Sequence, residues 1–109
     1  MFFISGNDIY LSQGESAAFQ IKPYDGEGEY NMDLGDTLRL TVKDRKSGRT
    51  VLVKETEPGY TTFRFEEKDT ANLAGKYDYK VELKYSMASP SVIIGKTATF
   101  TPHFIVLEG

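Results

Sequence analysis

The sequence predicts an all-β sandwich of antiparallel strands. Apolar or aromatic side chains alternate strictly with charged ones over residues 77–85, so one face of a strand carries Tyr77, Tyr79, Val81, Leu83 and Tyr85. A helix would spread these five positions around its circumference. Turn-forming residues recur roughly every eight to twelve positions along the chain, a spacing typical of sandwich strands and not of alternating strands and helices.

Short apolar segments between these turns give the order of the elements. Segments 2–4 and 9–11 flank a turn at 5–8 and form either a short hairpin or one bent edge strand. Residues 24–30 are expected to be a polar loop, and 44–48 a hairpin loop. Further strands are predicted over 15–22, 37–43, 50–55, 60–66, 77–85, 92–94 and 100–107. The predicted inward side chains outside 77–85 are Ala17, Phe19, Ile21, Leu38, Leu40, Val42, Phe63 and Phe65. Seven or eight strands in a single domain over residues 1–109 result.

Two local features interrupt this all-β pattern. Asp69 is expected to cap one helical turn, near residues 69–74, that ends near Gly75 with Leu73 as its buried anchor. Pro102 cannot donate a hydrogen bond to a neighbouring strand. The last strand is therefore expected either to lie at an edge of the sheet or to bend at Pro102.

Composition limits the classes of function. Thirteen basic and sixteen acidic residues give a net charge of −3, which argues against a nucleic-acid partner because such modules concentrate positive charge. The chain has no cysteine, so disulfides and thiolate metal sites are excluded. The N-terminus lacks the basic and apolar regions of a signal peptide, and no segment is long enough to span a bilayer. We expect a soluble protein that is made in the cytoplasm, without a membrane partner.

The corner before the strand at 77–85 resembles that of immunoglobulin-like sandwiches. There, a tyrosine hydroxyl bonds to nearby backbone just before a late strand. Gly75-Lys76-Tyr77-Asp78-Tyr79 matches this pattern, with Tyr77 as the corner tyrosine and Tyr79 in place of the family's cysteine. The resemblance implies an immunoglobulin-like architecture, and the missing cysteine pair and core tryptophan separate the chain from antibody domains.

Four segments in order are similar to the N-terminal domain of phage baseplate upper proteins and related small sandwich proteins of phages and prophages of Gram-positive bacteria. They are Gln13-Gly14-Glu15, the strand 35–43, the stretch 69–79, and Ile93-Ile94-Gly95 leading to Phe100-Thr101-Pro102. The resemblance implies a virion structural protein of the tail or baseplate that works by surface contact. Its partners would be other virion proteins or copies of itself, and it brings no catalytic residues and no cofactor.

Residues with catalytic or metal-binding chemistry are few. His103 is the only histidine, and a solvent-facing or loosely packed position beside Pro102 is expected for it. Asp25, Glu27 and Glu29 lack the spaced ligands of a calcium loop and are interpreted as a solvated turn. Two carboxylate pairs, Glu66 with Asp69 and Asp33 with Asp36, have the residue types that serve as acid and base in a glycosidase. Local hydrogen bonding in caps and turns is the favoured interpretation of both pairs. No enzyme activity, metal or cofactor is therefore predicted.

The possible partner contacts are tyrosines of loops and a basic hairpin tip. Tyrosine offers a large contact area at little entropic cost, although core packing accounts equally well for each of these side chains. The residues are Tyr24, Tyr30 and Tyr60, with Arg45, Lys46 and Arg49 at the tip. The predicted function is a protein-interaction module. A carbohydrate-binding or adhesion domain of the same fold is the alternative, and a small hydrolase is a third class.

Overall fold

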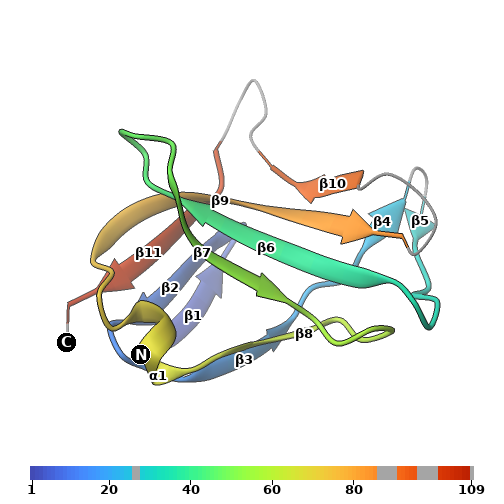
Figure 1. Cartoon of the computed structure of the whole chain (residues 1–109), viewed down its shortest axis with the longest axis horizontal. Coiled ribbons are helices and arrows are strands. Elements are labelled where there is room, and N and C mark those ends of the chain that lie inside the picture. Colours follow the sequence, from blue (N-terminus) through green and yellow to red (C-terminus); the bar gives the residue numbers. More distant parts are fainter. Residues whose placement is uncertain (26–27, 86–90, 96–100, 109) are drawn as a thin grey trace.

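A computed structural model of the chain describes residues 1–25, 28–85, 91–95 and 101–108. Its main element is a seven-stranded sheet in the order β1-β2-β11-β9-β6-β7, with β10 also paired to β9 (Figure 1). These strands are β1 Phe2–Ser5, β2 Asp8–Ser12, β6 Thr37–Lys43, β7 Thr50–Glu55, β9 Gly75–Lys84, β10 Ser91–Ile94 and β11 His103–Leu107. Residues 2–12 therefore form a hairpin, which decides between the two alternatives for this segment.

The main sheet is mixed. β2 and β11 run parallel, while its other described pairs are antiparallel. The prediction of antiparallel strands throughout is wrong for this pair. The two strands are distant in the sequence, and no short turn between them imposes an antiparallel arrangement.

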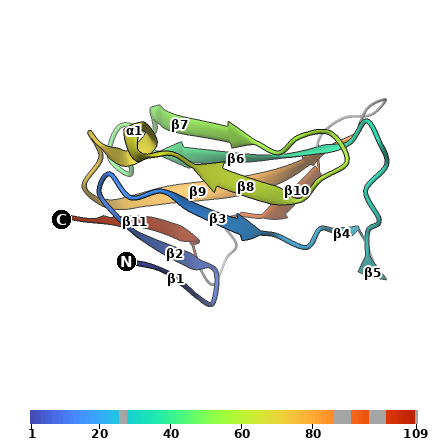
Figure 2. The same cartoon turned by 90° about the horizontal axis from the view of Figure 1, so that it is seen from below.

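A smaller layer covers one face of the main sheet (Figure 2). It consists of β3 Ala17–Gln20 paired with β8 Thr62–Phe65. Phe19, Phe63 and Phe65 point from it into the core, as predicted from their parity. The polar loop predicted over 24–30 contains a further small pair, β4 Tyr24–Asp25 and β5 Gly28–Glu29.

The central strands follow the predicted alternation. In β9 the side chains of Tyr79, Val81 and Leu83 are buried, and Tyr77 and Tyr85 pack against the same core. The neighbouring β6 buries Leu38, Leu40 and Val42. The mostly-β prediction with one short helical turn is confirmed, whereas the predicted seven or eight strands are too few, because the described residues form eleven.

The helical turn lies earlier in the chain than predicted. It is α1, Glu67–Thr70, so Asp69 is its third residue and not the residue before its first turn. The Asp69 carboxylate still caps the turn, because it accepts a hydrogen bond of 2.7 Å from the Glu66 N–H. Leu73 packs against the core as expected, whereas Gly75 already begins β9. Within the described part of the chain, no helix has the length and apolar character needed to cross a membrane.

Pro102 does not mark an edge strand. β11 begins at the next residue and lies between β2 and β9, so the edge position is wrong. β10 and β11 instead pair in succession with β9, at 81–83 and 75–78, and residues 95–102 separate them. Pro102 directly precedes β11, and its carbonyl accepts a hydrogen bond from the Tyr79 N–H at 3.3 Å.

The predicted hydrogen bonding of the Tyr77 hydroxyl to nearby backbone is confirmed. The Tyr77 hydroxyl accepts a hydrogen bond from the Ala74 N–H and donates one to the Ala74 carbonyl, each at 3.0 Å. These bonds join the start of β9 to the segment that follows α1. One side chain thus fixes the connection between the two layers.

Removing this hydroxyl should destabilise the fold measurably. Tyr77→Phe is expected to lower the unfolding free energy by about 1 kcal/mol, the usual net worth of such hydrogen bonding. Urea denaturation followed by circular dichroism measures the change. Tyr10→Phe is the control, because no hydrogen bond of its hydroxyl is seen among the described residues. Equal stability of Tyr77→Phe and the parent chain would contradict a structural role for this corner.

Candidate protein-interaction site

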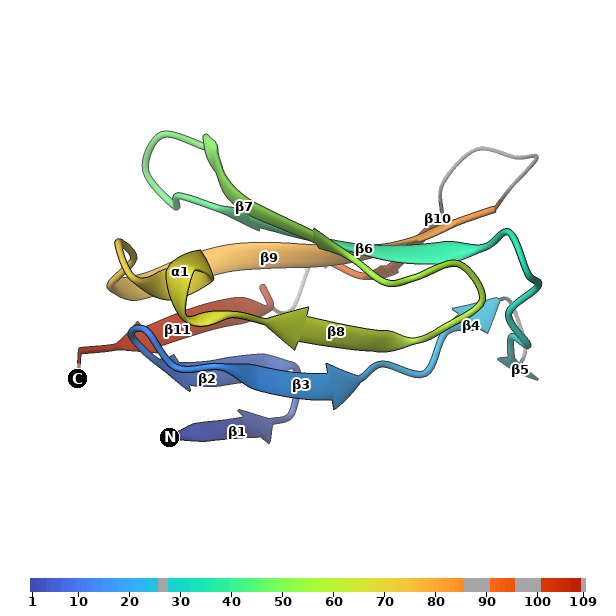
Figure 3. The ribbon, with the colours of Figure 1, turned by 60° about the horizontal axis from the view of Figure 1, so that its bottom comes forward.

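β1 and β7 lie at the two ends of the strand order of the main sheet (Figure 3), and β10, whose described pairing is with β9 alone, is a further short edge strand. On β1, Phe3 is 40 % and Ile4 46 % exposed, and Met1 beside them is also exposed. On β7, the exposed apolar residues are Val51 and Val53. Free strand edges offer unpaired N–H and C=O groups, so both sides are able to accept another strand.

The two edges differ in how they are protected. The register between β6 and β7 shifts between Val42 and Lys43, which places a bulge at the start of β7. β7 also carries Lys54 and Glu55, whereas all four residues of β1 are uncharged. Bulges and charges are the usual means of blocking unwanted strand pairing, so β1 is the less protected edge.

The basic tip between β6 and β7 is held in a defined turn. Asp44 Oδ1 accepts hydrogen bonds from the N–H groups of Lys46 and Ser47, both at 2.9 Å. The bond from Ser47 is the largest of the effects that lower the pKa of the Asp44 carboxyl. Arg45, Lys46 and Arg49 are all exposed, and Arg45 Nε lies 3.5 Å from Asp78 Oδ1. The tip therefore presents its cations on an ordered loop.

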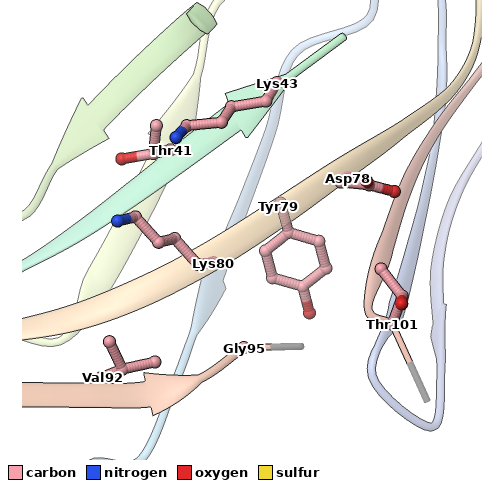
Figure 4. Close-up of a pocket in the computed structure, with 8 residues that line it drawn as sticks. All are labelled: Thr41, Lys43, Asp78, Tyr79, Lys80, Val92, Gly95 and Thr101. Carbon is pink, nitrogen blue, oxygen red and sulfur yellow. The ribbon is translucent and has the colours of Figure 1, made fainter. Parts of the chain in front are cut away.

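A groove of about 520 Å³ on the outer face of the main sheet is lined by residues of β6, β9 and β10, and by Gly95 and Thr101. Figure 4 shows the ammonium groups of Lys43 and Lys80 near Thr41, with Asp78 and Thr101 on the other side of Tyr79. The Tyr79 hydroxyl donates a hydrogen bond to the Asn7 carbonyl, and burial raises the pKa of this hydroxyl. Tyr79 is therefore a fixed neutral wall of the groove.

The three predicted contact tyrosines have different environments. The side chains of Tyr24 and Asp25 are outside the described part of the structure, and so is the whole of Glu27. Tyr30 is half-buried, meets Tyr85 edge to face, and donates a hydrogen bond to the buried Asp36, which raises the pKa of the Tyr30 hydroxyl. Tyr60 is 63 % exposed. Of the tyrosines whose side chains are described here, Tyr60 is the one most available to a partner.

The predicted carboxylate pairs make local hydrogen bonds, as expected. The Asp33 N–H donates to Asp36 Oδ2 at 3.1 Å, and the Glu66 N–H donates to Asp69. Each pair thus orders its own turn or helix start.

His103 is more enclosed than predicted. Its side chain is 20 % exposed and lies between two carboxylates, with Nδ1 3.7 Å from Asp8 Oδ1 and Nε2 3.8 Å from Asp78 Oδ1. The parallel pairing of β2 with β11 brings these side chains together, so no local sequence pattern predicts the cluster. Within the described ranges, no group of three or more histidine or acidic side chains is arranged to hold a metal ion.

Comparison with known proteins does not assign the chain to a family. No family model, curated protein or solved structure matches this chain. The interpretation of the surfaces therefore depends on their own geometry.

Proposed function

We propose that the chain is a non-enzymatic structural and protein-interaction module, a component of a phage or prophage tail or baseplate. The observation that carries the interaction role is the pair of free edges on the main sheet, each with exposed apolar side chains. A chain that joins others through strand edges needs such surfaces, and a protein that stays alone normally blocks them.

An immunoglobulin-like sandwich is the architecture that we propose for this module. In variable-type domains one sheet has the order G-F-C-C′, and strands B and E pair in the other. The order β11-β9-β6-β7 beside the pair β3-β8 supports this correspondence. The Tyr77 hydroxyl bound to Ala74, at the turn before β9, is consistent with the same family of folds.

The virion role is tested on particles. The chain is expected among the proteins of tails purified after prophage induction in the strain that encodes it. Quantitative mass spectrometry of the particle fraction measures its copy number against the other tail proteins. Its absence from purified particles, when it is present in the same lysate, would contradict the virion role.

The charged ends of the molecule provide one mode of assembly. The basic tip at 44–49 and the β4–β5 hairpin, which carries the exposed Glu29, lie at opposite ends (Figure 3). Head-to-tail contact between copies would bring the opposite charges together, and salt would weaken it.

Reversing the charge of the tip is the matching prediction. The parent chain is expected to increase in mass by light scattering at low ionic strength and high concentration, and this increase is expected to disappear as salt is added. The triple variant Arg45→Glu, Lys46→Glu and Arg49→Glu should show no salt-dependent change in mass through that series if the tip mediates the contact. Monomeric parent protein at low salt would refute the head-to-tail mode.

The carbohydrate-binding alternative receives less support. Sugar rings stack on exposed aromatic faces. On the outer face of the main sheet, Phe3 and Tyr10 stack on each other, with ring centroids 4.3 Å apart and planes 9° from parallel. Each ring covers one face of the other, so this pair is not a coplanar platform.

A further inference from the structure

We propose that two copies of the chain pair through β1, antiparallel about a two-fold axis at Phe3, so that their main sheets become continuous. This inference deepens the proposed interaction role and names one partner, a second copy. It depends on the direction of the backbone groups of β1, on its exposed side chains and on its lack of charge.

The backbone of β1 presents alternate residues to the free edge. The Ser12 N–H donates to the Met1 carbonyl at 3.1 Å, which makes Met1 and Ser12 a hydrogen-bonded pair. In an antiparallel ladder such pairs recur at every second residue, so Phe3 and Ser5 also face β2. The N–H and C=O groups of Phe2 and Ile4 consequently point away from the sheet.

These groups determine the register of a symmetric pair. A two-fold axis perpendicular to the sheet keeps side chains of one face together, so only residues of like parity align. Centring the pair on Phe3 places Phe2 opposite Ile4 of the second copy, and Ile4 opposite Phe2 of the second copy. Each of these pairs exchanges both hydrogen bonds, while the two Phe3 residues form the close non-hydrogen-bonded pair at the centre.

The same register covers exposed apolar surface. Phe3 already stacks on Tyr10, and the second Phe3 would extend this contact to a row Tyr10, Phe3, Phe3, Tyr10 across the junction. On the opposite face, Ile4, which is 46 % exposed, would pack against Phe2 of the other copy. Both faces of the junction are therefore apolar.

Charge selects a second copy as the occupant and β1 as the edge. On a two-fold axis a residue meets its own equivalent, so a charged side chain at the centre of the contact would meet a like charge. β1 has no charged residue, whereas β7 has Lys54 and Glu55, and β8, an edge strand of the smaller sheet, has Arg64. The edge strands β3 and β10 are also uncharged, but β3 exposes no large apolar side chain and the register of β10 with β9 is irregular. Among these described edge strands, β1 alone combines a regular register, exposed apolar side chains and no charge.

Proline at position 4 tests the hydrogen bonds. Ile4→Pro removes an N–H that faces outward, so the bonds of β1 to β2 remain. Val53→Pro is the matched control on β7. The Thr56 N–H donates to the Leu38 carbonyl at 3.0 Å, so the same alternation turns the Val53 N–H outward. Ile4→Pro is expected to raise the dimer dissociation constant about tenfold or more, and Val53→Pro to leave it unchanged, by light scattering over a concentration series. Circular dichroism checks that both variants fold.

Cross-linking tests the register independently. The chain has no cysteine, so Phe3→Cys introduces a single thiol. The Cα atoms of a close antiparallel pair lie about 4.5 Å apart, within the range of a disulfide. Phe3→Cys is expected to form a covalent dimer under mild oxidation about tenfold faster than the exposed control Val53→Cys, because pairing raises the local thiol concentration.

The outcomes separate this inference from the proposed function. A dimer that is weakened by Ile4→Pro, together with rapid cross-linking of Phe3→Cys, supports pairing through β1. A parent chain that stays monomeric at about 1 mM, or cross-linking no faster than that of Val53→Cys, overturns it. A dimer weakened by Val53→Pro and not by Ile4→Pro also overturns it. The particle measurement above tests the virion role whichever way these results fall.

Discussion

Phe63→Ala is expected to lower the free energy of unfolding by about 3–5 kcal/mol, the usual cost of removing a fully buried aromatic ring. Phe63 is completely buried on β8, and its ring lies 5.9 Å from that of Phe19 on β3. Phe19 in turn stacks on Phe65, which contacts Phe104 of the main sheet. This aromatic cluster thus packs the two-stranded smaller layer against the larger sheet.

The loss is measured by urea denaturation with fluorescence and circular dichroism as coincident probes. Phe63→Leu keeps most of the apolar volume and should lose less than the alanine variant, which also covers the case in which Phe63→Ala fails to fold. Tyr60→Ala, at an exposed position nearby in the chain, should change stability by less than about 0.5 kcal/mol. Similar small losses at positions 63 and 60 would contradict the assignment of Phe63 to the core.

The sequence was most informative about which side chains of a single strand face the core. The alternation from Tyr77 to Tyr85 predicted the buried face of β9 correctly, because each side chain's face follows from its position along one strand. The same applies to Leu38, Leu40 and Val42 on β6. The Tyr77 hydrogen bond was also predictable, since it joins residues three apart.

Capping was predicted with the right residue in the wrong position. Asp69 accepts the hydrogen bond expected of a capping side chain, but from Glu66, three residues before it. Asp and Glu serve both before a helix and at its third residue. The sequence Glu66-Glu67-Lys68-Asp69 fits both placements, and the single turn is too short for periodicity to decide between them.

Long-range pairing accounts for the other differences. Pro102 lacks the N–H for a ladder hydrogen bond at its own position, but this does not determine the place in the sheet of the strand that begins at His103. The cluster of Asp8, His103 and Asp78 requires the alignment of three strands, which residues 8, 78 and 103 do not reveal individually. The low protection of β1 likewise became evident only once its place at the edge of the sheet was known.

The ion pair of Lys54 with Asp69 leads to the second prediction. It joins β7 to α1 with 2.9 Å between Nζ and Oδ2, and both side chains are largely buried. The same Asp69 oxygen accepts the bond from the Glu66 N–H. Asp69→Ala is expected to lower the free energy of unfolding by about 2–3 kcal/mol, because it removes the cap and leaves the Lys54 charge without its partner. In the double variant with Lys54→Met the losses should be less than additive, and full additivity would contradict an energetic coupling of the pair.

The contribution of Asp69 should also depend on pH. Burial acts to raise the pKa of this carboxyl, but the hydrogen bond from Glu66 and the interaction with Lys54 together outweigh it, so the folded-state pKa is lowered. The unfolded chain, with an Asp pKa of about 3.9, then binds more protons in acid than the folded chain. The stabilisation is fully present above that value and is lost as the pH falls through the folded-state pKa. The stability difference between the parent chain and Asp69→Ala, measured by urea denaturation between about pH 6 and pH 2, should therefore shrink toward the acid end. A difference that is constant or grows on acidification would show that Asp69 does not act as a paired carboxylate.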